Sequence, residues 1–362
     1  MLLPKKERVG VDNRWADYEN PFIGKGVSPE NTWSSPKEDM GLLGQFNKLR
    51  RATNNSFALT LAVGGWTWSK NFSLAVATDS SRNSLAQSIV DLFSQWSCFN
   101  GVSIDWEYLS NDGVNYGNDG NIANPADCEN FAKFLEILRR KFNDKGWNHY
   151  HIAMCCTPAP EKIKFDIKRL VPLLDEWHVM TYEYPLPPSQ MITGSFASGA
   201  WSPTTSHQSN LYPSPYGQWS ASGAADAYIS RGVPANKIFI GAPFYSRGFG
   251  GSGGLGTPGS GPSPDKSYEA GIVDYKSLPL PGAVEMYDEV AQASYSYDAG
   301  RRVFNSYDNP RAVKAKCDYI KQKGLGGLII WESNYYFFVI GINCRCWRCS
   351  LGFGPFVVEG YS

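Results

Sequence analysis

The sequence predicts an α/β protein built as a TIM-type (β/α) barrel. Six short apolar runs bounded by turn residues are typical of strands, and most of them are followed by a helical pattern. Such alternation, with nearly continuous apolar strands, is typical of a parallel sheet covered by helices. The strands are widely spaced, and polar residues stand at their carboxyl ends, which favours a barrel over an open sheet.

The expected elements begin after residues 1–40, which are polar and irregular and predict a loop. The expected strands are residues 57–63, 101–106, 151–156, 177–181, 237–242 and 327–331, and the expected helices are residues 41–50, 81–96, 125–142, 167–174, 224–230 and 310–323. Residues 248–305 interrupt the alternation with a Gly/Ser/Pro-rich run and then Tyr-rich, strand-like segments. This stretch predicts a small α+β insertion before the last helix.

Composition excludes some classes of partner. The 362 residues include 34 basic and 34 acidic side chains, so nothing favours nucleic acid or an anionic membrane, both of which require a positive patch. No stretch reaches the roughly 18 apolar residues of a membrane span. The first residues, M-L-L-P-K-K, are too short and polar for a signal peptide. The 12 Trp and 20 Tyr predict either sugar-stacking surfaces or, more simply, a large aromatic core.

The eight cysteines give no metal site. Cys155 and Cys156 are adjacent on an expected buried strand, where free Cys behaves as a small apolar residue. The run from Cys344 to Cys349 resembles half a zinc site, but no second Cys/His pair stands near it. We therefore expect neither a metal nor a cofactor, and the disulfide pairing stays open.

The strongest chemical signal is the segment 99–108, F-N-G-V-S-I-D-W-E-Y. Side chains alternate along a strand, so Ser103, Asp105 and Glu107 point the same way. Polar and acidic side chains in one such row are costly in a core, so the row predicts a functional site at the mouth of the barrel. The alternative is a salt-bridged pair at the end of a strand.

This segment resembles the signature of family-18 glycoside hydrolases, the chitinases, whose active strand reads D-G-x-D-x-D-x-E. Four further segments resemble family motifs in the family's order: residues 61–69 (L-A-V-G-G-W-T-W-S), 180–183 (M-T-Y-E), 241–247 (G-A-P-F-Y-S-R) and 326–332 (G-G-L-I-I-W-E). The resemblance covers about residues 41–333. Five motifs in order make it specific.

The resemblance implies a retaining hydrolysis assisted by the substrate. Glu107 would protonate the glycosidic oxygen while the substrate's N-acetyl carbonyl attacks the anomeric carbon. Asp105 would bind the acetamido N–H, and its charge would raise the pKa of the acid. Tyr182 would bind the acetamido group from the other side, and Ser103 completes the catalytic set.

The resemblance also implies a set of substrate-binding residues, with Trp331 stacked under the sugar: Trp66, Tyr108, Met180, Glu183, Tyr245, Arg247 and Trp331. Each of these assignments has a plainer alternative. Met180, Tyr182 and Trp331 are also typical of core residues, and Arg247 is typical of a solvated surface residue.

The sequence departs from the family pattern at three positions. Asn100 and Ser103 replace the first two motif aspartates, and Ser103 cannot hold a charge. Glu183 replaces an aspartate and lengthens that side chain by one methylene. Six strands instead of eight imply a barrel lacking its first two strands, and we expect incomplete or faulty termini.

The predicted domains are an irregular segment (1–40), a catalytic barrel (41–247 and 306–333), an insertion module (248–305) and an atypical tail (334–362). The expected function is hydrolysis of β-1,4-linked N-acetylglucosamine polymers by a monomer acting on chitin or chito-oligosaccharides, extracellular by family resemblance. One alternative is a non-catalytic chitin-binding lectin, which Ser103 favours and Glu107 disfavours. Another is an endo-glycosidase on N-glycan cores, against which the insertion argues.

Overall fold

The computed structural model describes residues 2–5, 8–11, 15–23, 29–55, 57–183, 204–217 and 219–331. The chain divides into two compact units. The first unit comprises Met1–Cys156 and Ile163–Trp177, and the second comprises Thr157–Lys162 and His178–Ser362. The predicted domain boundaries stay a prediction, and the two units are taken separately below.

The first unit contains a sheet with three adjacent parallel strands, β3 (Thr60–Gly64), β4 (Gly101–Asp105) and β5 (His151–Cys156). Neighbouring residues are in register, with Thr60 opposite Gly101 and Gly101 opposite His151. Every residue of β4 is buried, as expected for a strand covered on both faces. The predicted bounds of β5 are confirmed to the residue, and β4 ends one residue earlier than predicted.

The prediction of a loop over residues 1–40 is wrong at its start. Strand β1 (Leu2–Lys5) pairs antiparallel with β2 (Arg8–Val11) and parallel with β3, which gives the order β5-β4-β3-β1-β2. The hairpin's short length and its Pro and Lys residues hid it from a pattern search, although these are features that edge strands use. Two short helical turns, Trp15–Glu19 and Lys37–Asp39, also lie in this segment.

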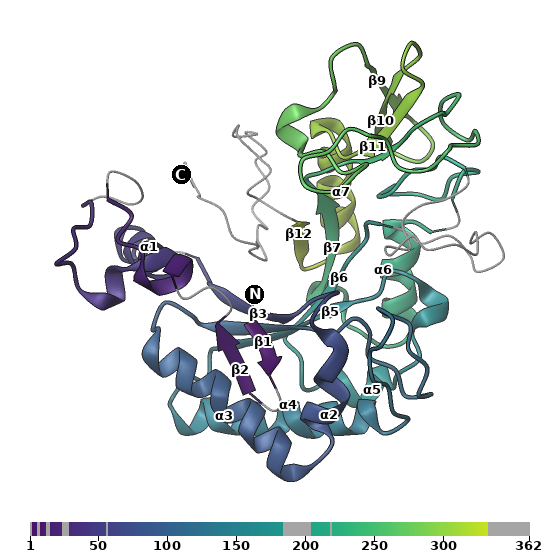
Figure 1. Cartoon of the computed structure of the whole chain (residues 1–362). Helices are drawn as coiled ribbons and strands as arrows, with labels where there is room; N and C mark the ends of the chain where they lie inside the picture. Colours follow the sequence, from purple (N-terminus) through teal and green to yellow (C-terminus); the bar gives the residue numbers. More distant parts are fainter. Residues whose placement is uncertain are drawn as a thin grey trace. The chain divides into compact units, whose positions relative to one another are not determined.

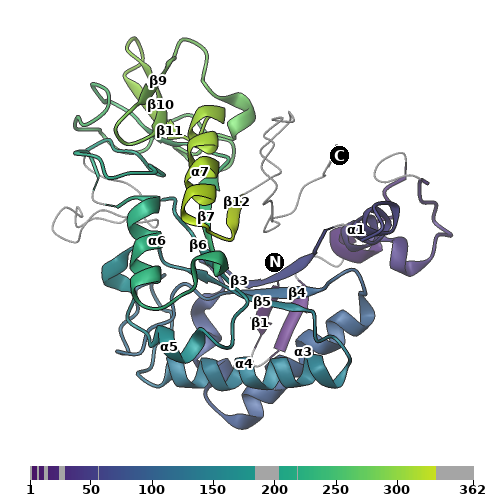
Figure 2. The same cartoon turned by 180° about the vertical axis from the view of Figure 1, so that it is seen from behind.

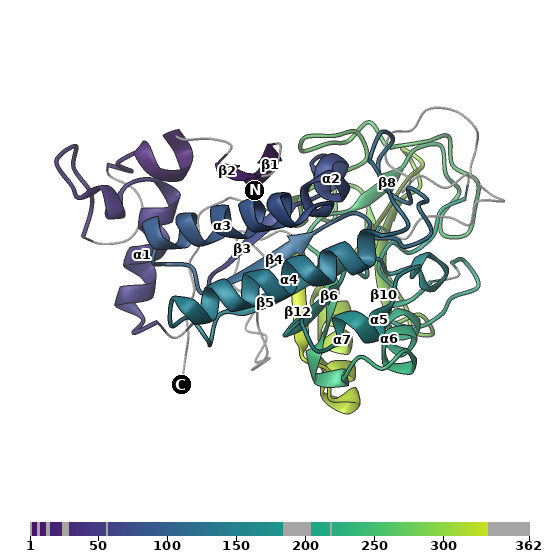
Figure 3. The ribbon, with the colours of Figure 1, turned by 90° about the horizontal axis from the view of Figure 1, so that it is seen from below.

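Two long helices cover the strands of the first unit. Helices α3 (Asp79–Gln95) and α4 (Asp127–Asp144) run side by side, as Figure 3 shows. Thr78 begins α3 with a capping box, in which its hydroxyl accepts from the Ser81 amide and the Ser81 hydroxyl accepts from the Thr78 amide. The unit also contains three shorter helices, namely α1 (Gly41–Ala52), α2 (Phe72–Val76) and α5 (Ile167–Leu170).

The second unit contains parallel strands β7 (Ile238–Pro243) and β12 (Gly327–Trp331), with Gly327 opposite Phe239. Strand β6 (Glu176–Val179) begins in the first unit and ends in the second. Helices α6 (Ala221–Ser230) and α7 (Pro310–Lys323) lie against β7 and β12 (Figures 1 and 2).

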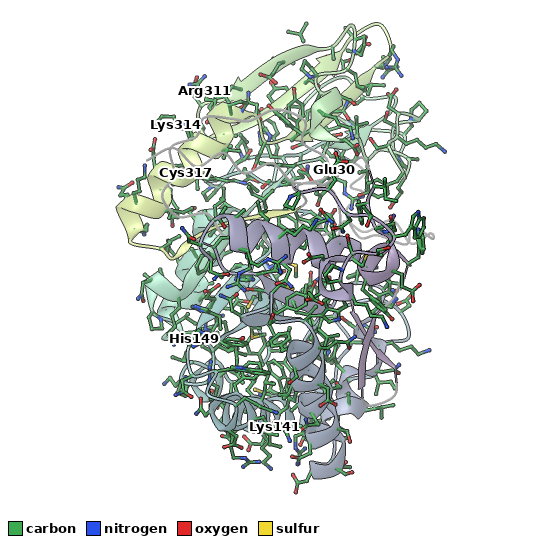
Figure 4. The ribbon with its side chains drawn as sticks, turned by 90° about the vertical axis from the view of Figure 1, so that its left-hand side faces the viewer. Glu30, Lys141, His149, Arg311, Lys314 and Cys317 are labelled. Atoms are coloured by element: carbon green, nitrogen blue, oxygen red, sulfur yellow. The ribbon has the colours of Figure 1, made fainter. Side chains whose placement is uncertain are left out.

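Sequence signals fix both ends of α7. The Asn309 side chain caps its first turn, Pro310 occupies the first position, and Gly324 ends it with a positive φ of 64°. Figure 4 shows Arg311, Lys314 and Cys317 along this helix. The predicted bounds of α7 are confirmed, and so are those of β12.

A second sheet of this unit is antiparallel and has the order β8-β11-β10-β9. Its strands are β8 (Arg247–Phe249), β9 (Val284–Asp288), β10 (Ala293–Asp298) and β11 (Val303–Tyr307). Strands β9 and β10 fall within the predicted insertion, 248–305, and β8 and β11 overlap its two ends, which confirms its strand-like segments. The predicted tail, 334–362, lies outside the described residues. No helix within the described ranges is long and apolar enough to cross a membrane.

Candidate active site

The row formed by Ser103, Asp105 and Glu107 lies on β4 and just beyond its end. Ser103 and Asp105 are 2% and 6% exposed, and Glu107 follows two residues after the strand ends, half-buried. Trp106 points to the opposite side, where its ring stacks on Phe72 of α2 at 5.2 Å and meets Phe131 of α4 edge-on at 5.9 Å. Trp106 therefore faces the helices, as expected for a residue that alternates with Asp105 and Glu107 along the chain.

Cys155 of β5 lies beside this row and had no signal in the sequence beyond an apolar run. Its Sγ atom is 3.6 Å from the hydroxyl oxygen of Ser103. Burial raises the pKa of the Cys155 thiol well above its usual value, and the nearby negative charge of Asp105 adds to the shift. The thiol is therefore neutral, so the row meets an uncharged neighbour on this side.

Two glycines allow the end of β3 to approach the end of β4. The Gly65 amide donates to the carbonyl oxygen of Asp105 at 2.7 Å. A Cβ atom on Gly64 would lie 2.2 Å from the same oxygen, and both glycines have positive φ. Trp66 comes next, half-buried, and its carbonyl accepts a 3.5 Å hydrogen bond from Asn118. This explains physically why G-G precedes the tryptophan.

In the second unit, the M-T-Y-E segment after β6 is pinned to β7. The Thr181 hydroxyl donates to the Gly241 carbonyl at 3.1 Å and accepts from the Gly241 amide at 2.7 Å. A Cβ atom on Gly241 would lie 2.6 Å from the ring of Tyr182, so the glycine makes room for that ring. Tyr182 is half-buried and Met180 is 8% exposed, which agrees with a packing role for Met180.

Glu183 joins two other predicted residues. Its Oε1 atom accepts from the Tyr245 hydroxyl at 2.6 Å and from Arg247 Nη2 at 2.5 Å. Burial and the adjacent carboxylate raise the pKa of Tyr245 well above its usual value. Burial disfavours the charge on Arg247, but Glu183, Tyr245 and Glu269 together outweigh it, and the pKa of Arg247 is raised. The solvated alternative for Arg247 is wrong, since the residue is 4% exposed.

Trp331 and Tyr108 complete the predicted set. Trp331 ends β12, half-buried, and its carbonyl accepts from the Phe244 amide at 2.8 Å. Tyr108 follows Glu107 directly in the first unit and is also half-buried. Each unit thus gathers its own members of the predicted set, the acids in the first unit and the Glu183 cluster in the second.

A buried lysine network supports the M-T-Y-E segment, and the sequence analysis missed it. The Lys316 ammonium, fully buried, donates to the carboxylate of Asp308, to the Ser209 hydroxyl and to the Gly241 carbonyl. The Ser209 hydroxyl in turn donates to the Thr181 carbonyl at 2.8 Å. Burial lowers the pKa of Lys316 and raises that of Asp308, and the charge of each partially offsets this effect on the other. Lys316 falls within the apolar stripe of its helix, which was the available signal.

Within the described residues, no group of three or more His, Cys, Asp or Glu side chains is arranged to hold a metal ion. Five cysteines of this part of the chain are buried: Cys98, Cys128, Cys155, Cys156 and Cys317. The run from Cys344 to Cys349 lies outside the described residues, so its half-site is not placed.

Comparison with known proteins gives one family. The model of "Glycosyl hydrolases family 18" matches residues 3–335. Endochitinase 1 of Metarhizium robertsii is 32% identical over 332 residues, which are 88% of this chain and 70% of that protein. Chitinase A1 of Niallia circulans is 31% identical over 353 residues, which are 91% of this chain and 47% of that protein.

Solved structures agree with the sequence matches. Chitinase ChiA74 from Bacillus thuringiensis superposes with a TM-score of 0.77 at 27% identity, over 96% of this chain and 56% of that one. The catalytic domain of chitinase B from Arthrobacter TAD20 gives a TM-score of 0.75 at 28% identity, over 88% and 75% of the two chains. These matches confirm the predicted TIM-type barrel class. The chain spans little more than half of the ChiA74 chain.

Proposed function

Because the chain belongs to family 18 of the glycosyl hydrolases, a family of glycosidases whose matched relatives are chitinases, we propose that it hydrolyses chitin, the β-1,4-linked polymer of N-acetylglucosamine. The observation that carries the proposal is the row of Ser103, Asp105 and Glu107. Glu107 lies past the end of a buried strand and is half-buried, and we propose that its carboxyl group meets the substrate there.

The proposed mechanism is the substrate-assisted retaining route. Glu107 donates its proton to the glycosidic oxygen as the bond to the anomeric carbon breaks, and the substrate's acetamido carbonyl oxygen forms the new bond to that carbon. Asp105 accepts a hydrogen bond from the acetamido N–H and stabilises the positive oxazolinium intermediate. Glu107, now ionised, then removes a proton from the water that opens the intermediate with retention.

In the second unit we propose that Tyr182 donates a hydrogen bond to the acetamido group. The close approach of its ring to Gly241 supports this role, because the contact fixes the plane of the ring and so the direction of the hydroxyl group. Trp331 offers a ring face to the apolar C–H face of a sugar. In the Glu183 cluster, Tyr245 and Arg247 fix a partly exposed carboxylate that can accept hydrogen bonds from sugar hydroxyls. Trp66, Tyr108 and Met180 are proposed as further substrate contacts.

The second candidate is a chitin-binding lectin, in which the same residues bind chitin without turnover. Ser103 favours this reading, because a hydroxyl beside a neutral thiol cannot take up the charge that an aspartate holds. Glu107 disfavours it, since a lectin has no need of the acid. We propose further that the protein acts outside the cell as a monomer on chitin or chito-oligosaccharides, as its family resemblance implies.

The test is hydrolysis of a fluorogenic chitotrioside by the wild-type chain and by Glu107→Gln, from about pH 4 to about pH 8. The matched control is Glu289→Gln, which removes an exposed carboxylate paired with Arg311. We expect turnover in the wild type and the control, and a loss of at least a hundredfold in kcat in Glu107→Gln. Folded protein that binds chitin beads without turnover would establish the lectin instead.

A further inference from the structure

The main chain of Glu107 is held at both its amide and its carbonyl by side chains from two other segments. The Glu107 amide donates to the hydroxyl oxygen of Ser69 at 2.8 Å. The Glu107 carbonyl accepts from the side-chain amide of Asn121 at 2.8 Å. Ser69 begins the short turn Ser69–Asn71 after β3, and Asn121 lies in the loop between β4 and α4.

Ser69 connects the ends of two neighbouring strands. It is fully buried, and besides accepting from Glu107 its hydroxyl is placed to donate to the carbonyls of Gly65, at 2.9 Å, and Asp105, at 3.2 Å. The Ser69 hydroxyl therefore contacts Gly65 just after β3, Asp105 at the end of β4, and the amide of Glu107. A side chain without an oxygen at this position would leave that amide without this acceptor.

The loop after β4 also approaches the main chain of Glu107. A Cβ atom on Gly117 would lie 2.0 Å from the Glu107 carbonyl oxygen, so the loop closes at this point only because residue 117 has no side chain. The Ile122 amide donates to the carbonyl of Lys70 at 3.1 Å, which joins this loop to the turn that carries Ser69. The turn that carries Ser69 and the loop that carries Gly117 and Asn121 are therefore hydrogen-bonded to each other within the first unit.

We propose that Ser69, Gly117 and Asn121 form a clasp that sets the position of Glu107 for proton transfer. They are positioning residues, and the proposal rests on the proposed role of Glu107 as the acid. Strand β4 ends at Asp105, two residues before Glu107. The hydrogen bonds of the clasp therefore hold the main chain of Glu107 where those of the sheet have ended. A general acid must lie within hydrogen-bond reach of its oxygen, and an error of about 1 Å can cost about a hundredfold in rate.

The first test removes the Asn121 donor without changing the shape of the side chain. Asn121→Asp places a carboxylate oxygen against the Glu107 carbonyl, and we expect kcat on the chitotrioside to fall about 10- to 100-fold with KM changed less than about twofold. The control is Asn124→Asp in the same loop, where the side-chain oxygen keeps its role as acceptor from the Ala126 amide. This control should keep the wild-type kcat.

The second test removes the other arm. Ser69→Ala should lower kcat by a similar factor, and Ser69→Thr, which keeps a hydroxyl, should recover most of it. The control is Ser73→Ala, since Ser73 is also buried but donates to Asp127 instead. Both alanine variants should lower the melting temperature, so only the change in kcat separates positioning from general stability. The double variant Ser69→Ala/Asn121→Asp should lose less than the product of the single losses.

A third variant tests closure, and a separate readout tests the clasp itself. Gly117→Ala should lower kcat like the other clasp variants, whereas Gly217→Ala, where a Cβ has room, should not. Amide hydrogen exchange at Glu107 should be faster in Ser69→Ala than in wild type. Turnover in all clasp variants equal to that of their controls would overturn the proposal, and so would unchanged exchange. A wild-type chain without turnover would instead overturn the proposed function. The rate of amide hydrogen exchange at Glu107 would then be the remaining test of the clasp.

Discussion

Arg247 donates a 2.5 Å hydrogen bond to Glu183 from a nearly buried position, with the arginine side chain 5% exposed and the glutamate 35% exposed. The pair brings together two residues that the sequence placed in separate motifs. Because the same carboxylate oxygen accepts from Tyr245, the glutamate orients both side chains at once. Glu183, which stands where the family pattern has an aspartate, therefore has its own hydrogen bonds to Tyr245 and Arg247.

Glu183→Gln should destabilise the protein, because the buried guanidinium of Arg247 would face a neutral amide. We expect the free energy of unfolding to fall by about 1–2 kcal/mol, after allowance for the partial exposure of Glu183. Urea unfolding measures it. Glu289→Gln, which breaks an exposed pair with Arg311, is the control and should show no measurable change. Equal effects in the two variants would show that the Glu183 contacts do not stabilise the fold.

Lys316 and Asp308 should behave as a coupled pair. Removing one partner leaves an uncompensated buried charge, so we expect Lys316→Met or Asp308→Asn alone to cost about 3–5 kcal/mol of unfolding free energy. The double variant should recover at least half of the summed loss, because both charges are then gone. The control is Lys314→Met, which breaks an exposed pair with Asp318 on the same helix and should be silent in urea unfolding. Strictly additive losses would contradict the coupling.

His207 should make stability depend on pH. Its Nε2 lies 3.0 Å from the carboxylate of Asp288, and burial lowers the pKa of the imidazole below 6.5 despite that neighbour. The unfolded chain then binds the proton more readily. The contribution of neutral His207 to stability is therefore complete above about pH 6.5 and is lost as pH falls through the lowered pKa. The pKa of Asp288 is also lowered, so protonation of Asp288 affects stability only at pH values below its ordinary pKa of 3.8.

The measurement is urea unfolding between about pH 7 and about pH 4.5. His207→Gln keeps a donor for Asp288 and should flatten the loss of stability over this range. His149→Gln changes an exposed histidine and should leave the loss as in wild type. A steep loss that persists in His207→Gln would assign the effect to other groups.

Ser103→Asp should change the pH dependence of turnover. It would add a third carboxylate to the row, at a buried position next to Asp105, and two buried neighbouring carboxylates ionise together only at a cost, so one proton is retained. We expect the acid limb of the pH–rate profile to move upward by about one pH unit or more. A group with a raised folded pKa binds the proton more readily in the folded state. The stability of the variant relative to wild type should therefore fall as pH rises above about 4. An unmoved acid limb would show that position 103 does not influence the row.

Local signals in the sequence were sufficient for most elements. Asn309, Pro310 and Gly324 predict both ends of α7 because capping and positive φ depend on neighbours in the chain. Alternation along residues 101–107 predicts which side chains share a side with Glu107, because the period of a strand is a local property. The hairpin of β1 and β2 was not predicted, since short edge strands carry little apolar pattern.

Contacts between distant segments were decided only by the tertiary structure. Lys316 joins Asp308, Ser209 and Gly241, and Cys155 lies beside Ser103, from positions that no spacing in the chain relates. The clasp around Glu107 is of the same kind, since Ser69 and Asn121 lie 38 and 14 residues from it. The sequence by itself determined the family, the order of the elements after the β1–β2 hairpin, and the chemical types at the site. The fold alone decided which neutral or charged groups surround them, because burial and distance exist only once separate strands and loops have packed together.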